Sequence, residues 1–283
     1  AVCWTATGLA FEVASKRIGS FSLNVIRLLF AFVFLGLFGL ISRGMFLPLD
    51  AGNHQWIWLA LSGLVGFVLG DYFLFRAYAI ISSRTSMLVM TLVPLFTAVI
   101  SFFMLNEMMT WIEIFGMFLV IGGISIAVIH RGGKRIQLVY STKGLLFALG
   151  GAVGQAVGLV LSKYGMQDYD AFAATHIRII AGASGFVFLA LVLNKTKKVI
   201  GSLRDKRGMK GAFIGSVFGP FLGVSLSLYA VQRANTGVAS TLMAIVPVLI
   251  ILPSWLLFRQ KVTLREILGA VISVGGVFVL VFY

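Results

Sequence analysis

Acidic side chains and cysteines are scarce in this chain. Only 9 of its 283 residues are Asp or Glu, against 23 Lys or Arg, and charged residues together make up 11%. The single cysteine, Cys3, excludes an intrachain disulfide bond and a cysteine-based metal site. His176 stands alone in its predicted span, and a lone histidine does not make a metal site either. We therefore expect no bound metal and no cofactor.

Apolar residues are abundant instead. They make up 59% of the chain, and the mean hydropathy is +1.02. A water-soluble globule of this length could not bury so much apolar surface, so the sequence indicates an integral membrane protein. The net charge of +14 raises nucleic acid as a partner. However, most basic residues lie in short segments between apolar runs, as in membrane proteins, so we expect no nucleic acid.

The apolar runs are continuous rather than alternating, which favours helices over barrel strands. A membrane-spanning helix needs about 20 apolar residues, and ten segments approach that length. They lie near residues 1–15, 21–41, 56–79, 86–105, 111–129, 144–163, 171–193, 211–232, 238–258 and 264–283. The predicted fold is an all-α integral membrane protein with ten transmembrane helices. The first segment is short, so we expect its helix to end nearer Ile18 or to begin upstream.

One stretch, residues 91–128, recurs 153 residues further along the chain. Each copy has a proline near its start, a short polar break and a Gly-Gly pair near its end. The matched positions are Met90/Met243, Val93/Val246, Pro94/Pro247, Ser101/Ser254, Thr110/Thr263, Glu113/Glu266, Ile114/Ile267, Gly116/Gly269, Gly122/Gly275 and Gly123/Gly276. The chain is therefore an internal duplication.

The duplication extends to the earlier helices. Ile26-Arg27 matches Ile177-Arg178, and Gly8-Leu9 matches Gly158-Leu159. The halves are residues 1–135 and 143–283. Each holds five predicted helices, and an odd number inverts the second half in the bilayer. Inverted repeats predict a site near mid-membrane between the halves.

This organisation resembles the EamA-type proteins of the drug/metabolite transporter superfamily over essentially the whole chain. The residues that carry the resemblance are Trp4, Asn24 to Arg27, Gly70-Asp71, Pro94, Pro247 and the break Asn106-Glu107. In the second half Arg259-Gln260 replaces the acidic break, so a symmetric pair of charges is not expected. The resemblance implies an exporter or exchanger of small metabolites, with a cavity lined by the first, third, fourth, sixth, eighth and ninth helices.

Loop charges predict an orientation. Seventeen Lys or Arg residues lie in the loops after the odd-numbered helices, and only Arg43, Lys163 and Arg233 lie in the others. The positive-inside rule then places both termini outside the cell. Relatives in this family are usually described with both termini in the cytoplasm, so the charge distribution and the resemblance disagree.

Asp71 and Glu12 are the acids that we place inside or at the edge of a predicted span. A carboxylate in hydrocarbon costs about 2.5 kcal/mol or more, so it usually faces a partner or a wet cavity. Asp71 is a candidate for proton or cation coupling; the alternative is a structural pair with Arg27 or Arg76. Glu12 is a second candidate by resemblance to four-helix multidrug relatives. A salt bridge to Lys16, four residues on, is its alternative role.

The repeat-equivalent Arg27 and Arg178 lie near the starts of their predicted helices. They either reach toward headgroups or bind a carboxylate or phosphate of the substrate. Further candidates for substrate binding are polar or aromatic side chains inside predicted spans. They are Trp4, Tyr72, Tyr78, Gln155, Tyr229 and Gln232. Aromatic side chains of membrane proteins also form interfacial belts or face lipid.

Pro94 and Pro247 interrupt backbone hydrogen bonding at equivalent places, so we predict bends there that line a cavity or allow gating. Glycines three or four residues apart indicate close helix packing rather than phosphate-binding loops.

The leading hypothesis is a secondary transporter, expected to export small metabolites such as amino acids by alternating access. Coupling to protons through Asp71 or Glu12 is part of this hypothesis. We expect a multi-pass protein of the inner or plasma membrane, monomeric or homodimeric, with a small-molecule substrate. The alternative is a lipid-moving protein or a non-transporting scaffold or receptor-like protein. A membrane-embedded enzyme is not expected, because no zinc-protease, paired-aspartate or Ser-Lys motif falls within a span.

Overall fold

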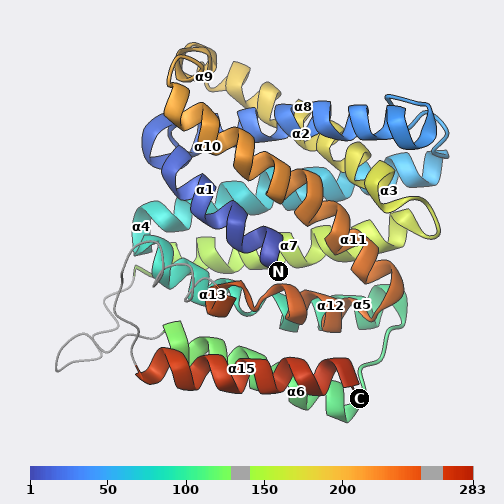
Figure 1. The fold of residues 1–283 in the computed structure, drawn as a ribbon, viewed down its shortest axis with the longest axis vertical. Coiled ribbons are helices and arrows are strands. Elements are labelled where there is room, and N and C mark those ends of the chain that lie inside the picture. The colour runs from blue at the N-terminus through green and yellow to red at the C-terminus, as the bar shows by residue number, and fades with distance from the viewer. Residues whose placement is uncertain (129–140, 250–263, 283) are drawn as a thin grey trace. The chain divides into compact units, whose positions relative to one another are not determined.

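The computed structural model describes residues 1–128, 141–249 and 264–282, and every regular element within these ranges is a helix (Figure 1). The helices before residue 129 are α1 (Val2–Ile18), α2 (Ser20–Arg43), α3 (Asn53–Gly63), η1 (Leu64–Gly70), α4 (Asp71–Met90), α5 (Val93–Leu105) and α6 (Trp111–Val128). Those after residue 140 are α7 (Thr142–Met166), α8 (Ala171–Val192), α9 (Thr196–Ser202), α10 (Lys206–Ser216), η2 (Val217–Gly223), α11 (Val224–Arg233), α12 (Thr236–Met243), α13 (Val246–Leu249) and α15 (Leu264–Phe282).

The helical membrane fold predicted from the sequence is confirmed. Within the described ranges, five helical stretches are long and apolar enough to cross a bilayer, and three shorter helices are also apolar. The long stretches are Ser20–Arg43, Asn53–Leu74, Thr142–Met166, Ala171–Val192 and Lys206–Arg233. Helix α1 ends at Ile18, as its short apolar run suggested.

Three predicted boundaries were wrong. The segment 86–105 is divided, because α4 continues to Met90 and α5 starts at Val93. The segment 238–258 also breaks after α12, and its part beyond Leu249 lies outside the described residues. The predicted segment 211–232 starts earlier, because α10 begins at Lys206, and the short helix α9 precedes it. Apolar composition continues through a proline-induced break, so composition alone does not reveal it.

The helix ends are set by local backbone chemistry. Asp170 accepts a hydrogen bond from the Ala173 backbone N–H (2.8 Å) at the start of α8. Asp205 does the same with Gly208 (2.8 Å) at the start of α10. Both are N-caps that satisfy otherwise unpaired backbone donors. Helix α2 ends at Arg43 and is capped by Gly44, whose φ of 70° lies in the left-handed region that glycine adopts without strain.

The chain forms two compact units, and each draws helices from both halves of the sequence. Unit 1 comprises Leu69–Val160 and Ala234–Tyr283 with Ala1, and unit 2 comprises Val2–Val68 and Leu161–Arg233. In unit 2, α2 packs on α8, α1 on α10, and α3 on α8. In unit 1, α6 packs along α15 and α5 packs on α12.

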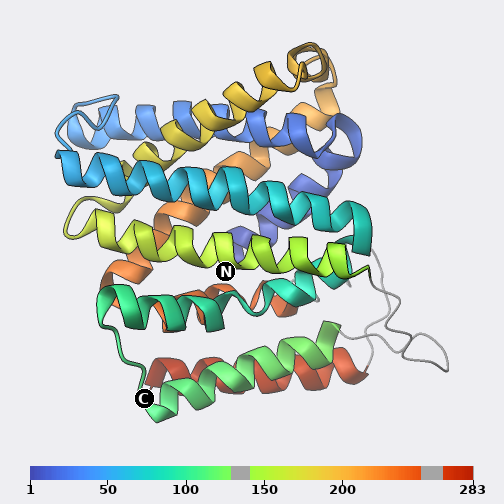
Figure 2. The ribbon, with the colours of Figure 1, turned by 180° about the vertical axis from the view of Figure 1, so that it is seen from behind.

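Helices α6 and α15 lie side by side in both ribbon views (Figures 1 and 2). A Cβ on Gly116 would lie 3.2 Å from the Gly276 carbonyl oxygen, and one on Gly123 would lie 2.6 Å from that of Gly269. Between these two contacts, Ser273 Oγ donates to the Val120 carbonyl oxygen at 3.3 Å. Contact positions rise along α6 as they fall along α15, so the two helices are antiparallel. They are also repeat equivalents.

Two π-helical segments occupy equivalent places in the two halves. Adding the repeat shift to the bounds of η1, Leu64–Gly70, gives those of η2, Val217–Gly223. In η2, a Cβ on Gly223 would lie 2.7 Å from the carbonyl oxygen of Phe218, so the wide turn needs a glycine there. Such π segments are often found at functional sites. The residue that follows is Asp71 in the first half and Val224 in the second.

Candidate functional site

In unit 1, the structure brings together two of the predicted site residues. Asp71 begins α4 directly after η1, and its side chain is only 6% exposed. The amide nitrogen of Gln155, on α7, donates a hydrogen bond to Asp71 Oδ1 at 3.0 Å. A carboxylate held by an amide donor inside a helical membrane protein can accept a proton or bind a cation. Both residues were predicted from the sequence as separate site candidates, but the contact between them was not.

Both predicted proline bends are present in the backbone of unit 1. Thr91 and Leu92 form a turn before α5, and Ala244 and Ile245 form one before α13. Pro94 and Pro247 are the second residues of the helices that follow. Proline lacks an N–H and clashes with the carbonyl four residues earlier, so it is tolerated in a first turn but not within a helix. The breaks are thus explained, while their role in gating stays a prediction.

The acidic break of the first half has a local structural role in unit 1. Glu107 Oε2 accepts a hydrogen bond from the backbone N–H of Thr236 (2.7 Å), at the start of α12. Asn235 Nδ2 donates to Glu113 Oε1 (3.3 Å). Glu113 also accepts from the Thr110 backbone N–H (2.6 Å), which completes a capping box. These contacts join the α5–α6 connection to α12 and were not predicted from the sequence.

Trp4 lies in unit 2, where it ties α1 to α11. Its indole N–H donates to Ser227 Oγ at 3.2 Å. A Cβ on Gly223 would lie 3.4 Å from the Trp4 ring, so the indole also packs against the end of η2. These contacts fix the indole between helices of its own unit.

Arg27 and Arg178, the repeat-equivalent arginines, differ in their surroundings. Arg27 is half-buried, and its guanidinium carbon lies 5.7 Å from the centroid of the Phe11 ring. Arg178 is 5% exposed, with its guanidinium carbon 4.9 Å from the centroid of the Phe67 ring. Burial of Arg178 argues against the alternative in which it reaches toward lipid headgroups.

Among the candidate aromatic residues whose side chains the structure describes, Tyr72 and Tyr229 are the most exposed. Arg76 Nε donates to the Tyr72 hydroxyl at 3.3 Å. Tyr229 is 47% exposed, and the guanidinium carbon of Arg233 lies 3.7 Å from its ring centroid. Tyrosine is enriched at membrane–water interfaces. The role of Tyr72 and Tyr229 in substrate binding stays a prediction.

Gln232 holds a loop in unit 2. Its side-chain nitrogen donates to the carbonyl oxygens of Gln167 (2.7 Å) and Tyr169 (3.2 Å). The Tyr169 hydroxyl in turn donates to Asp50 Oδ1 at 2.9 Å, and Arg43 forms an ion pair with Asp50. Burial raises the pKa of Tyr169, and the hydrogen bond to Asp50 acts in the same direction. This network stabilises the α7–α8 connection and was not predicted.

The side chains of Glu12, Tyr78 and Pro247 lie outside what the structure describes, although their backbones belong to α1, α4 and α13. Their predicted roles therefore stay predictions. In the described part of the chain, no group of three or more His, Cys, Asp or Glu side chains is placed to hold a metal ion.

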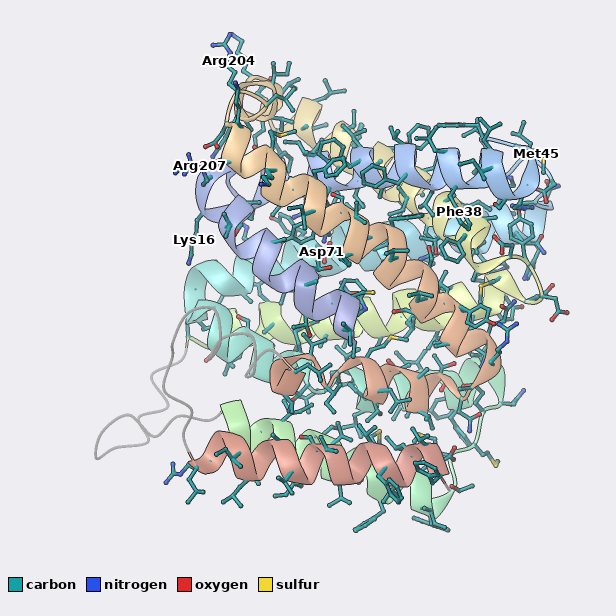
Figure 3. The ribbon with its side chains drawn as sticks, in the orientation of Figure 1. Lys16, Phe38, Met45, Asp71, Arg204 and Arg207 are labelled. Carbon is teal, nitrogen blue, oxygen red and sulfur yellow. The ribbon has the colours of Figure 1, made fainter. Side chains whose placement is uncertain are left out.

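A small pocket with a cavity volume of only about 10 Å³ lies at one end of unit 2 and is lined in part by Phe38, Met45 and His176. Figure 3 shows Phe38 and Met45 at the opposite end of this unit from Lys16 and Arg204. Metabolite pockets usually measure about 300–1,000 Å³. We therefore do not place the substrate there.

Comparisons with known proteins agree with this architecture. The chain is 22% identical over 251 residues to an uncharacterized transporter, sll0355, of Synechocystis sp., covering 84% of this chain and 75% of that protein. It is 23% identical over 223 residues to an uncharacterized transporter of Archaeoglobus fulgidus, covering 77% and 75%. A crystal structure with 18% identity matches the fold with a TM-score of 0.75, over 98% of this chain and 94% of the other.

The family model described as the EamA-like transporter family matches residues 1–129 and 142–282. Each match covers one copy of the duplication, and together they span nearly the whole sequence. The resemblance carried by Trp4, Asp71 and the paired prolines is thereby confirmed. The chain is a multi-pass membrane protein that belongs to the EamA-like transporter family.

Proposed function

We propose that this protein is a secondary transporter that exports small metabolites, such as amino acids or related compounds, by alternating access. Two five-helix repeats of opposite orientation would provide its moving parts. The antiparallel packing of the equivalent helices α6 and α15 supports inversion of the repeats. Helices of both halves contribute to each compact unit, as expected for intertwined repeats.

The observation that carries the proposal is the buried pair of Asp71 and Gln155, with a hydrogen bond of 3.0 Å. Burial makes a carboxylate costly unless its charge has a use or a partner. Here Asp71 follows a π-helical segment, where the backbone departs from regular α-helix geometry. We propose that Asp71 couples proton or cation movement to transport, and that Gln155 orients its carboxylate.

Proteoliposome transport tests this function. Purified protein is reconstituted, and accumulation of a panel of radiolabelled amino acids and related metabolites is measured with and without a pH gradient. Gradient-driven accumulation is expected for at least one compound in the wild type and is expected to vanish in Asp71→Asn. Asp205→Asn serves as the matched control, because Asp205 is partly exposed and precedes the spanning stretch Lys206–Arg233.

Intact gradient-driven accumulation in both Asp71→Asn and Glu12→Gln would reject proton coupling. Absence of transport for the whole panel, combined with lipid scrambling by the same vesicles, would favour the lipid-moving alternative.

A further inference from the structure

Arg178 is a charged side chain in the interior of unit 2. It is the eighth residue of α8, which begins at Ala171, and it is 5% exposed. At a rise of 1.5 Å per residue, the backbone at Arg178 lies about 10 Å along the helix from its start. This depth places it inside the spanning stretch Ala171–Val192.

Within the described chain, the Arg178 guanidinium has no hydrogen-bond acceptor and no ion-pair partner. Its Nε atom is buried without a hydrogen bond, and its recorded contact is with the face of Phe67 at 4.9 Å. A cation–π contact is worth about 0.5–2 kcal/mol, whereas burial of an unpaired ion costs several kcal/mol. The ring of Phe67 therefore does not compensate the charge.

Backbone packing fixes the position of this charge. A Cβ added to Gly63 would lie 2.3 Å from the Arg178 carbonyl oxygen, so α3 and α8 touch at these two residues. The flanking side chains Ile177 and Ile179 are both fully buried. The guanidinium therefore projects from a rigid part of α8.

At the repeat position of Asp71, the second half has no carboxylate that could act as a counter-ion. Arg27, its equivalent, is only half-buried and takes part in further interactions. In the first half, Asp71 follows the π-helical segment; in the second, Val224 stands at that place. Helix α11, which Val224 begins, packs on α8, and Val224 is 5% exposed in the same apolar core as Ile179. The second half thus offers α8 an aliphatic side chain where the first half has a carboxylate.

We propose that Arg178 binds an oxyanion, the carboxylate or phosphate group of the transported compound; this assignment rests on the proposed function. A guanidinium presents a planar set of donors that matches these groups with two parallel hydrogen bonds. Bound anion supplies the charge that the described residues do not. The substrates are then anionic or zwitterionic metabolites, and a compound without an oxyanion binds poorly.

Equilibrium binding to the purified full chain in neutral detergent tests the proposal without requiring transport. Calorimetry at constant ionic strength is run with inorganic phosphate, succinate and L-glutamate as probes, and with L-leucinamide as a probe that lacks an oxyanion. Wild type is expected to bind at least one oxyanion. Arg178→Met is expected to weaken that binding by about 100-fold, and Arg178→Lys by about tenfold because a lysine cannot form the bidentate contact. Arg204→Met, which changes an exposed arginine at one end of unit 2, is the matched control and is expected to bind as wild type.

Thermal unfolding adds a second readout. Without ligand, Arg178→Met is expected to melt above wild type, because an uncompensated buried charge is removed. The oxyanion that binds wild type is expected to raise its Tm but not that of the variant. Unchanged oxyanion binding in Arg178→Met, or no binding of any oxyanion to wild type, would overturn the proposal. If Arg178→Met does not fold, the same comparison is made with Arg178→Lys, where equal affinity to wild type overturns it.

Two further experiments distinguish a substrate oxyanion from a lipid headgroup, and the role of Arg178 from the proposed transport function. Binding is repeated in nanodiscs of phosphatidylcholine and of phosphatidylglycerol: soluble probes that bind equally in both assign the subsite to a substrate, while competition by phosphatidylglycerol assigns it to a lipid headgroup. Transport that persists unchanged for anionic compounds in Arg178→Met overturns the role of Arg178 alone. Oxyanion binding without any transport overturns the proposed function alone.

Discussion

In the first half of the chain, Asp71 follows a π-helical segment and accepts a hydrogen bond from Gln155; in the second half, Val224 follows the equivalent segment and lies in an apolar core. The two places share their backbone geometry, including the seven-residue π segment before each. They differ in charge. Duplication has therefore kept the helical framework, while the polar side chains have diverged. We place function in the divergent positions.

The largest effect on this difference is expected from placing a carboxylate at position 224. Val224→Asp gives α11 a carboxylate on the helix that packs against α8. If that carboxylate pairs with Arg178, oxyanion binding is expected to weaken by about tenfold or more, because the charge that attracts the ligand is neutralised. The measurement is calorimetry with the oxyanion that binds wild type.

Val224→Asn is the matched control, since it has the same shape without the charge. Val224→Asn should lose less affinity than Val224→Asp. Equal affinities of the two variants would show that position 224 does not reach the charge of Arg178.

The framework was largely readable from the sequence, whereas the partners of its polar groups were not. The bounds of α2, α6 and α8 follow from apolar runs, and the breaks before α5 and α13 follow from Pro94 and Pro247. These features depend on neighbours along the chain. The hydrogen bond between Asp71 and Gln155 joins residues 84 positions apart, and it depends on how helices pack.

The isolation of Arg178 was equally invisible from the sequence. Its resemblance to Arg27 suggested that the two would act alike, because the repeat matches their positions. The two arginines differ in their exposed fraction and in the groups around each guanidinium. An internal repeat in the sequence specifies neither. The repeat did contain a signal: Val224 stands in place of Asp71, so the second half lacks that acid.

Adjacent glycines in α6 and α15 test a feature that the two halves share, the close packing of these equivalent helices. A Cβ on Gly123 would lie 2.4 Å from Ser273 Oγ, and one on Gly276 would lie 2.8 Å from the Gly116 carbonyl oxygen. The preceding residues, Gly122 and Gly275, have no such neighbour within 4 Å. In lipid, close packing rather than hydrophobicity holds helices together.

We therefore expect Gly123→Ala and Gly276→Ala each to destabilise the protein by about 1–3 kcal/mol through overpacking. Gly122→Ala and Gly275→Ala should be neutral or stabilising by up to about 1 kcal/mol, as alanine favours helix. Thermal unfolding in detergent checks the four variants. If Gly276→Ala behaved like Gly275→Ala, the antiparallel contact of the two equivalent helices would be wrong.

The smallest expected effect concerns the equivalent starts of α10 and α3, which the two halves cap differently. Asp205 caps α10 and receives hydrogen bonds from Arg17 Nε (2.9 Å) and the Gly208 N–H (2.8 Å). At the equivalent start of α3, Gly52 makes no side-chain cap. The hydrogen bond from Arg17, followed by that from Gly208, lowers the pKa of the Asp205 carboxyl. A carboxyl whose folded-state pKa is depressed contributes stability above its unfolded-state pKa and loses it as pH falls through the folded-state pKa.

Asp205→Asn should therefore lower the Tm slightly at neutral pH and match wild type in acid, below the pKa of the folded state. Gly52→Asp should raise the Tm slightly at neutral pH by adding the missing cap, since its φ of −73° suits any residue. The Gln55 side chain near a Cβ at this position is flexible and can move aside. Melting curves of both variants across acid and neutral pH test the pair. A Tm difference for Asp205→Asn that did not change with pH would mean that shape, and not the charge shared with Arg17, sets the strength of this cap.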